Sequence, residues 1–166
     1  MSQMDARITL TAAQEGDVPL ILYFIRQLAE YERLATKVVA SEAILRESLF
    51  GKQPKAEVVI ARFGDEPAGI AVFFHNFSTF AGRAGIYLED LFVEPKFRRH
   101  GIGKALLAHL AKLTKERNCA RLEWAVLDWN APAIKFYKKL GAEAMDDWTV
   151  YRVSGDELDH LAKLTS

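Results

Sequence analysis

The sequence contains a single cysteine, Cys119, among its 166 residues. An internal disulfide needs two cysteines and a cysteine-based zinc cluster needs more, so both are excluded. The four histidines are scattered and show neither HxxxH nor HExxH spacing, which argues against a catalytic metal. With only ten glycines and five prolines, the chain is also unlike collagen or a disordered protein.

An excess of one charge is absent as well, since 22 basic residues balance 22 acidic residues. Proteins that bind nucleic-acid phosphates normally carry a basic surplus, so no nucleic-acid partner is expected. The longest aliphatic run, Leu20 to Ile25, is far shorter than the ~20 residues of a membrane span. The N-terminal segment has no apolar stretch typical of a signal peptide. We therefore expect a cytoplasmic protein that has no membrane partner.

Half of the residues are hydrophobic, and the length suits one domain over residues 1–166. Apolar spacing and turn residues predict strands over 8–11, 56–63, 68–77, 85–93 and 121–126, and helices over 18–31, 41–49, 102–116 and 133–140. A last hairpin or pair of strands is predicted over 145–154 and a short helix over 156–164. This order predicts an α/β (mixed α+β) fold with a mixed, mostly antiparallel sheet and helices on both faces.

The stretch from Leu88 to Leu107 combines a strand, a basic loop with glycines and the start of a helix. Free N–H groups and the helix dipole favour an anion there, and glycines let a phosphate approach the backbone. By spacing alone, Gly101 and Gly103 could equally serve only to relieve a tight turn. The loop lacks the GxxxxGK[ST] pattern of a Walker P-loop and the third glycine of GxGxxG.

The remaining pattern, R-x-x-G-x-G from Arg98 to Gly103, resembles the acetyl-CoA pyrophosphate loop of the GNAT superfamily of N-acetyltransferases. Residues 129–142, WNAPAIKFYKKLGA, resemble the N-x-x-A-x-x-[FL]-Y-x-x-x-G-[FA] region of the same enzymes. Residues 87–93 and 28–32 resemble the spermidine/spermine (diamine) and thialysine N-acetyltransferase branch. The resemblance implies a GNAT-like three-layer fold, acetyl-CoA as cofactor with CoA as product, a small-molecule amine as substrate, and a homodimer.

The resemblance also implies the residues that hold the cofactor. The strand before the loop carries a bulge in these enzymes, and its backbone contacts the acetyl carbonyl. The side chains of Phe92 and Val93 are expected to lie in the core. The implied cofactor contacts are Leu91, Phe92, Val93, Arg98, Arg99, His100, Gly101, Ile102, Gly103, Lys104, Asn130, Pro132, Ala133 and Tyr137.

Acetyl transfer needs a neutral amine, although a lysine-like amine has a pKa of ~10.4. Glu89 is the candidate that attracts the ammonium and removes its proton, directly or through water. The alternative is a strand carboxylate paired with an arginine such as Arg98. Since consecutive strand side chains point to opposite faces, Asp90 is expected not to share the pocket and to be structural. Tyr137 is the candidate general acid toward the CoA sulfur; spacing alone favours an ordinary helix tyrosine, and the resemblance favours the acid.

On the acceptor side, the resemblance implies substrate contacts by Tyr31, Glu32, Glu89, Glu123, Trp124 and Ala125. A second carboxylate suits the far ammonium of a diamine, whereas a solvated helix end is an equal alternative for Tyr31 and Glu32. Residues 78–80 depart from the aspartate and tryptophan of the polyamine enzymes, so a thialysine-like amino acid fits as well. Two other functions stay open: acetylation of a peptide or protein amine, and a non-catalytic acyl-CoA-binding module.

Overall fold

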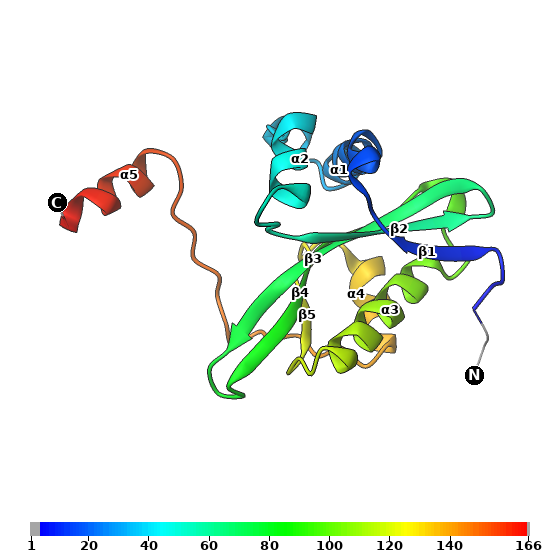
Figure 1. Ribbon diagram of the computed structural model, residues 1–166. Coiled ribbons are helices and arrows are strands. Elements are labelled where there is room, and N and C mark those ends of the chain that lie inside the picture. The colour runs from blue at the N-terminus through cyan, green and yellow to red at the C-terminus, as the bar shows by residue number, and fades with distance from the viewer. Residues whose placement is uncertain (1–3, 166) are drawn as a thin grey trace. The chain divides into compact units, whose positions relative to one another are not determined.

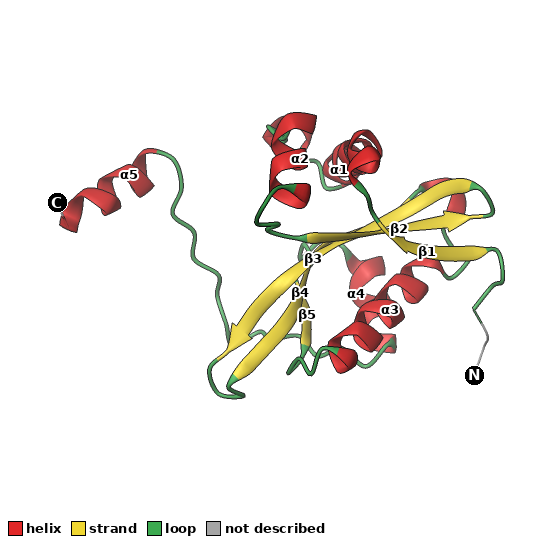
Figure 2. Ribbon diagram, viewed as in Figure 1, coloured by secondary structure: helices red, strands yellow, loops and turns green. Residues whose placement is uncertain are grey.

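The computed structural model describes residues 4–165 and divides into two compact units, Met1–Leu127 and Asp128–Ser166 (Figure 1). The first unit contains one five-stranded sheet, seen in yellow in Figure 2, whose strands follow the chain order β1-β2-β3-β4-β5. These strands are β1 (Ile8–Ala12), β2 (Glu57–Phe63), β3 (Glu66–Ser78), β4 (Arg83–Val93) and β5 (Leu122–Trp124). The first four strands pair antiparallel and β5 runs parallel to β4, which confirms the predicted mixed, mostly antiparallel sheet.

Two helices cover one face of this sheet, α1 (Val18–Tyr31) and α2 (Glu42–Phe50) (Figure 1). The α2 helix starts where predicted, because the Ser41 side chain accepts a hydrogen bond of 3.3 Å from the Ile44 N–H. Burial of apolar surface holds this layer together. Its core contains Val18, Ile21, Leu22, Phe24, Leu45, Leu49, Val58, Ile60, Ile70, Val72 and Phe92.

The third helix of this unit, α3 (Ile102–Glu116), lies on the opposite face of the sheet (Figure 1). Its buried residues include Ile102, Leu106 and Leu110, which recur at helical spacing. The buried Thr114 hydroxyl donates to the Leu110 carbonyl at 2.7 Å, so this polar group inside the layer is satisfied. Helices on both faces of the sheet confirm the predicted three-layer arrangement.

The second unit contains α4 (Ala131–Lys139), α5 (Asp156–Ala162) and the 3-10 turn Lys163–Thr165. As predicted, a glycine follows α4: Gly141 has φ of 88° and its N–H donates to the Lys138 carbonyl at 3.1 Å. The hairpin predicted over 145–154 is wrong, because no strand forms there in the structure. The alternating apolar residues that suggested it lack a neighbouring strand, and Trp148 and Tyr151 are 78% and 91% exposed.

The prediction of one domain over 1–166 stays a prediction beside these two units. Among the described helices, none combines the length and apolar character needed to cross a bilayer. In the same residues, no group of three or more histidine, cysteine, aspartate or glutamate side chains is arranged so that it could hold a metal ion.

Candidate active site

A bulge interrupts β4 in the middle of the predicted site. Phe73 of β3 lies opposite Leu88, whereas the preceding residue, Val72, lies opposite Asp90. Glu89 is therefore the extra residue of a β-bulge, which re-aims the side chains around it. The bulge that the family resemblance implied is present in this strand.

The bulge changes which β4 side chains share a face. Tyr87 lies opposite Phe74 and Asp90 lies opposite Val72, and these two β3 residues are two positions apart. Side chains two apart on a strand point the same way, so Tyr87 and Asp90 face the side of the sheet that α1 covers. The strict alternation that separated Glu89 and Asp90 in the sequence analysis is wrong at this point of the strand.

The edge of β4 is open beyond the bulge. Its parallel pairing with β5 runs only from Ile86–Leu122 to Leu88–Trp124, whereas β4 continues to Val93. Among the described residues, no strand lies on that side of residues 89–93. Unpaired backbone groups at such an edge can bind an extended ligand. Leu91, Phe92 and Val93 are thus placed where a thioester carbonyl could meet the backbone.

The loop after β4 ends in an uncapped helix start. Gly101 has φ of 86°, a left-handed conformation that favours glycine, and no side chain caps α3. The first helical bond joins the Ala105 N–H to the Gly101 carbonyl, at 2.9 Å. The first turn has no acidic residue, whereas Ser41 caps α2 and Asn130 caps α4. These features fit a bound anion such as a pyrophosphate.

Arg98 holds the loop against two other parts of the site. Its Nε donates to the Val93 carbonyl at 3.0 Å, and its guanidinium carbon lies 4.9 Å from the centre of the Tyr31 ring. The same guanidinium lies 5.8 Å from the Phe92 ring. No ion pair joins it to Glu89 among the described residues, so the alternative of a Glu89–Arg98 pair is not observed.

Other basic loop residues have separate surroundings. The Lys96 ammonium pairs with Glu66 and lies 4.7 Å from the Phe97 ring centre. The His100 ring packs 4.7 Å from the Phe63 ring. Arg99, like Gly101, adopts a left-handed backbone conformation, with φ of 69°. A contact of Arg99, His100 or Lys104 with phosphate stays a prediction.

Three carboxyl groups gather at the bulge and the end of α1. Burial, followed by the nearby charges of Glu89 and Glu32, raises the pKa of Asp90 to about 6. Burial also raises the pKa of Glu32, the residue that follows α1. Asp90 has neither a hydrogen-bond donor nor a cationic partner in the part of the chain that is described. This cluster is suited to attract a cation.

Aromatic side chains border these carboxyl groups. The Phe74 and Tyr87 rings lie 5.3 Å apart, and Tyr31 is in contact with Arg98. Burial, and then the charges of Glu89 and Glu123, raise the pKa of Tyr87. Sequence reasoning missed Tyr87, Phe74 and Asp90 because the bulge that puts them on one face has no signature in the sequence.

Glu123 already has two donors. Its Oε1 accepts hydrogen bonds from Asn76 Nδ2 at 3.2 Å and from Arg121 Nε at 2.8 Å. A carboxylate held in this way stabilises the β3–β5 region. Since Glu123 pairs with Tyr87 and faces the same side of the sheet, its contact with substrate stays a prediction. Trp124 and Ala125 end and follow β5 beside it.

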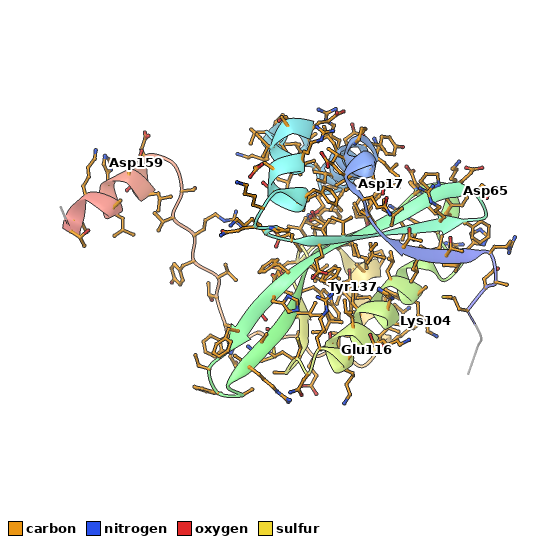
Figure 3. All side chains as sticks on the ribbon, viewed as in Figure 1. Asp17, Asp65, Lys104, Glu116, Tyr137 and Asp159 are labelled. Atoms are coloured by element: carbon orange, nitrogen blue, oxygen red, sulfur yellow. The ribbon has the colours of Figure 1, made fainter. Side chains whose placement is uncertain are left out.

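The remaining predicted residues belong to the second unit. The Asn130 side chain is buried and its Oδ1 accepts a hydrogen bond from the Ala133 N–H at 3.4 Å, so the predicted cap is present. Pro132 occupies the first turn of α4, as expected. Tyr137, labelled in Figure 3, lies on α4 with its ring 5.5 Å from that of Phe136. Its role as general acid stays a prediction.

Comparison with known proteins identifies the family of this chain. Residues 23–142 match the Acetyltransferase (GNAT) family. The chain is a member of the GNAT family. This confirms the resemblance from which the site was predicted, and it makes the protein an N-acetyltransferase. Acetyltransferases of the GNAT family use acetyl-CoA as acetyl donor.

Individual GNAT relatives agree with this assignment. Thialysine N-epsilon-acetyltransferase of Bos taurus is 36% identical over 95% of this chain and 98% of its own length. L-ornithine N5-acetyltransferase of Arabidopsis thaliana is 31% identical over 98% of this chain and 90% of its own. Among solved structures, an integron cassette protein from V. cholerae has a TM-score of 0.80 at 30% identity, covering 96% of this chain and 99% of its own.

Proposed function

We propose that this protein transfers the acetyl group of acetyl-CoA to a primary amine of a small cationic molecule. The acceptor class is a diamine, a polyamine or a thialysine-like amino acid, and the amine attacks directly in a ternary complex. The observation that carries this proposal is the gathering of Glu32, Glu89 and Asp90 at the bulge of β4, the strand whose following loop leads into the uncapped start of α3. The names of the relatives support a small amine, since one acts on thialysine and another on L-ornithine.

The proposed cofactor site uses mainly backbone groups. The N–H groups at the start of α3, from Gly101 to Lys104, bind the pyrophosphate, and Arg98 fixes the loop that carries them. The open edge of β4 from Leu91 to Val93 holds the thioester carbonyl. We also assign cofactor contacts to Arg99, His100, Asn130, Pro132, Ala133 and Tyr137.

The acceptor site is proposed on the α1 side of the bulge. Tyr31, Glu32 and the aromatic pair Phe74–Tyr87 surround the amine chain, and Glu123, which pairs with Tyr87, faces the same side. Substrate contacts of Trp124 and Ala125, at the end of β5, are also part of the proposal. The carboxylates lower the energy of the bound cation. Glu89 attracts the ammonium and draws off one proton, directly or through water, because only the neutral amine has a free electron pair.

An acceptor screen tests the proposal. We expect thiol release when the protein is mixed with acetyl-CoA and thialysine, ornithine or a linear diamine, and much less with a peptide amine. Fast turnover of a peptide and none of a small amine would move the assignment to peptide or protein acetylation. No thiol release with any acceptor, together with tight acetyl-CoA binding, would identify a non-catalytic acyl-CoA-binding module.

We further propose that the protein is a homodimer. Its second unit exposes large apolar side chains that water contacts unfavourably, and a second copy is the partner expected to cover them. The exposed residues of this kind are Met145, Trp148, Val150, Tyr151, Leu158, Leu161 and Leu164. Light scattering after size exclusion should give twice the mass of one chain, and Val150→Lys should lower that mass. A wild-type protein at the mass of one chain would reject the dimer.

The cytoplasmic location also stays a prediction. Cell fractionation checks it directly, since we expect the protein in the soluble fraction together with other acetyl-CoA-dependent enzymes. Recovery from a membrane pellet or from the culture medium would contradict it.

Asp90 gives a stability prediction that is separate from activity. Its folded pKa of about 6 lies above the unfolded reference of 3.8, so its ionisation destabilises the fold as pH rises through about 6. Below the unfolded pKa this cost vanishes. Asp90→Asn removes the charge and should raise the free energy of unfolding by about 1–2 kcal/mol more at about pH 8 than at about pH 5.

Urea denaturation at the two pH values measures this difference. Asp65→Asn is the matched control, because Asp65 is exposed in the turn between β2 and β3 (Figure 3). The control should change stability equally at both pH values. Equal effects of Asp90→Asn at both values would contradict the raised pKa.

A further inference from the structure

Asp90 of β4 has no hydrogen bond or ion pair that would give it a structural role in the described part of the chain. Asp90 is partly buried, yet among the described residues no N–H, O–H or cation binds it. The titratable groups acting on it are Glu89 on the same strand and Glu32 at the end of α1. Tyr87 shares its face, Val72 and Phe74 contribute apolar surface from β3, and the Arg98 cation is engaged with the Val93 carbonyl.

The position of Asp90 comes from the bulge and not from its own hydrogen bonds. Because Glu89 has no partner on β3, two consecutive carboxyl groups stand opposite the single residue Val72. Two neighbouring carboxylates repel each other, and the protein relieves that repulsion by binding either a proton or a cation. The charge of Glu89 therefore favours the protonated form of the more buried Asp90.

We propose that Asp90 is a further catalytic residue, which forms with Glu89 a coupled carboxylate pair that accepts the proton of the acceptor ammonium. This inference rests on the proposed function and deepens it, because it assigns proton acceptance to the pair and not to Glu89 alone. Glu89 is exposed and meets the arriving cation, and Asp90 lies deeper on the α1 side.

An N–H bond of the ammonium breaks, its electron pair stays on nitrogen, and the proton binds a carboxylate oxygen of the pair. The nitrogen then forms a bond to the thioester carbonyl carbon, while the C–S bond breaks and its electron pair leaves on sulfur. Sulfur takes a proton from the Tyr137 hydroxyl, which regains one from the new amide nitrogen. The pair finally releases its proton to water.

Several properties of Asp90 suit this task. Burial favours its neutral form, so accepting a proton lowers the energy of the group and its repulsion from Glu32. Its raised pKa brings Asp90 closer to neutral pH than an exposed aspartate, and a general base works best when its pKa lies near the working pH. In the free enzyme the ionised form of Asp90 is destabilised, and an incoming cation reduces that destabilisation.

The test combines kinetics with a direct titration. The variants are Asp90→Asn, Glu89→Gln and the exposed control Asp65→Asn, with ornithine as acceptor. We expect Asp90→Asn to lower kcat/KM about tenfold, since Glu89 remains as an acceptor, and to shift the acidic limb of the pH profile. In ¹³C NMR, the titration midpoint of the Asp90 carboxyl should fall when Glu89 is replaced by glutamine.

The outcomes separate this inference from the proposed function. If the wild type acetylates amines but Asp90→Asn keeps both its rate and its acidic limb, Asp90 is not catalytic. If the titration midpoint of the Asp90 carboxyl is the same in the wild type and in Glu89→Gln, the coupled pair is rejected. This holds whether or not the enzyme is active on the acceptors tried. If the wild type is inactive on every amine, the proposed function is rejected. The catalytic role of Asp90 is then rejected as well. Acetyl-CoA binding must stay unchanged in Asp90→Asn, since a loss there would mean a structural effect.

Discussion

Tyr137→Phe is expected to lower kcat by about 10²- to 10⁴-fold, the usual contribution of a general acid or base. The substitution removes one hydroxyl and leaves the ring, which packs beside Phe136 on α4. Without that hydroxyl the departing thiolate must take its proton from water. The KM for acetyl-CoA should change little, because the lost proton transfer acts only in the transition state. Steady-state thiol release measures both constants.

Tyr151→Phe is the matched control for this experiment. Tyr151 belongs to the same unit but to neither proposed binding site, and phenylalanine keeps the ring that the proposed dimer would cover, so loss of its hydroxyl should leave kcat unchanged. A Tyr137→Phe enzyme with the turnover of the wild type would remove Tyr137 from the mechanism. A parallel fall in thermal stability would instead indicate that the hydroxyl supports the fold.

Gly103→Pro is expected to weaken acetyl-CoA binding by about 10- to 100-fold, the range for losing one hydrogen bond to a charged group. Gly103 is the second residue of α3, where proline removes an N–H that no helical carbonyl requires. The chain itself places Pro19 and Pro132 at the same position of α1 and α4. The helix should therefore form, and the lost donor should appear as weaker binding.

Gly103→Ala separates the donor from the shape of the loop. It keeps the N–H and adds only one methyl group, so we expect binding close to that of the wild type. Calorimetry of both variants gives the two dissociation constants. Equal weakening by alanine and proline would mean that space, and not the backbone donor, matters at this position.

Much of the fold follows from local sequence signals. The α1 and α3 helices occupy the predicted residues 18–31 and 102–116, because their apolar periodicity is long and strong. The caps at Ser41 and Asn130 and the glycine at Gly141 also lie where their side-chain chemistry predicts. Such signals depend on neighbouring residues alone, which is why one sequence suffices to find them.

The centre of the site could not be predicted in the same way. A bulge depends on how β4 pairs with β3, and residues 86–92 show nothing that distinguishes a regular strand from one with Glu89 inserted. A shift of one residue reverses the faces of the side chains beyond it, so the strict alternation that separated Asp90 from the pocket of Glu89 does not hold here. The hairpin predicted over 145–154 is wrong for a related reason. An alternating pattern forms a strand only beside a partner strand, and the pattern itself does not show whether one is present.

The most direct test of the account is a calorimetric titration of the wild-type protein with acetyl-CoA. Every proposed role depends on the start of α3 and the open edge of β4 holding this donor. We predict saturable binding at one site per chain, weakened by Gly103→Pro and preserved by Gly103→Ala. A titration that shows no saturable heat for the folded wild-type protein at any temperature would contradict the account.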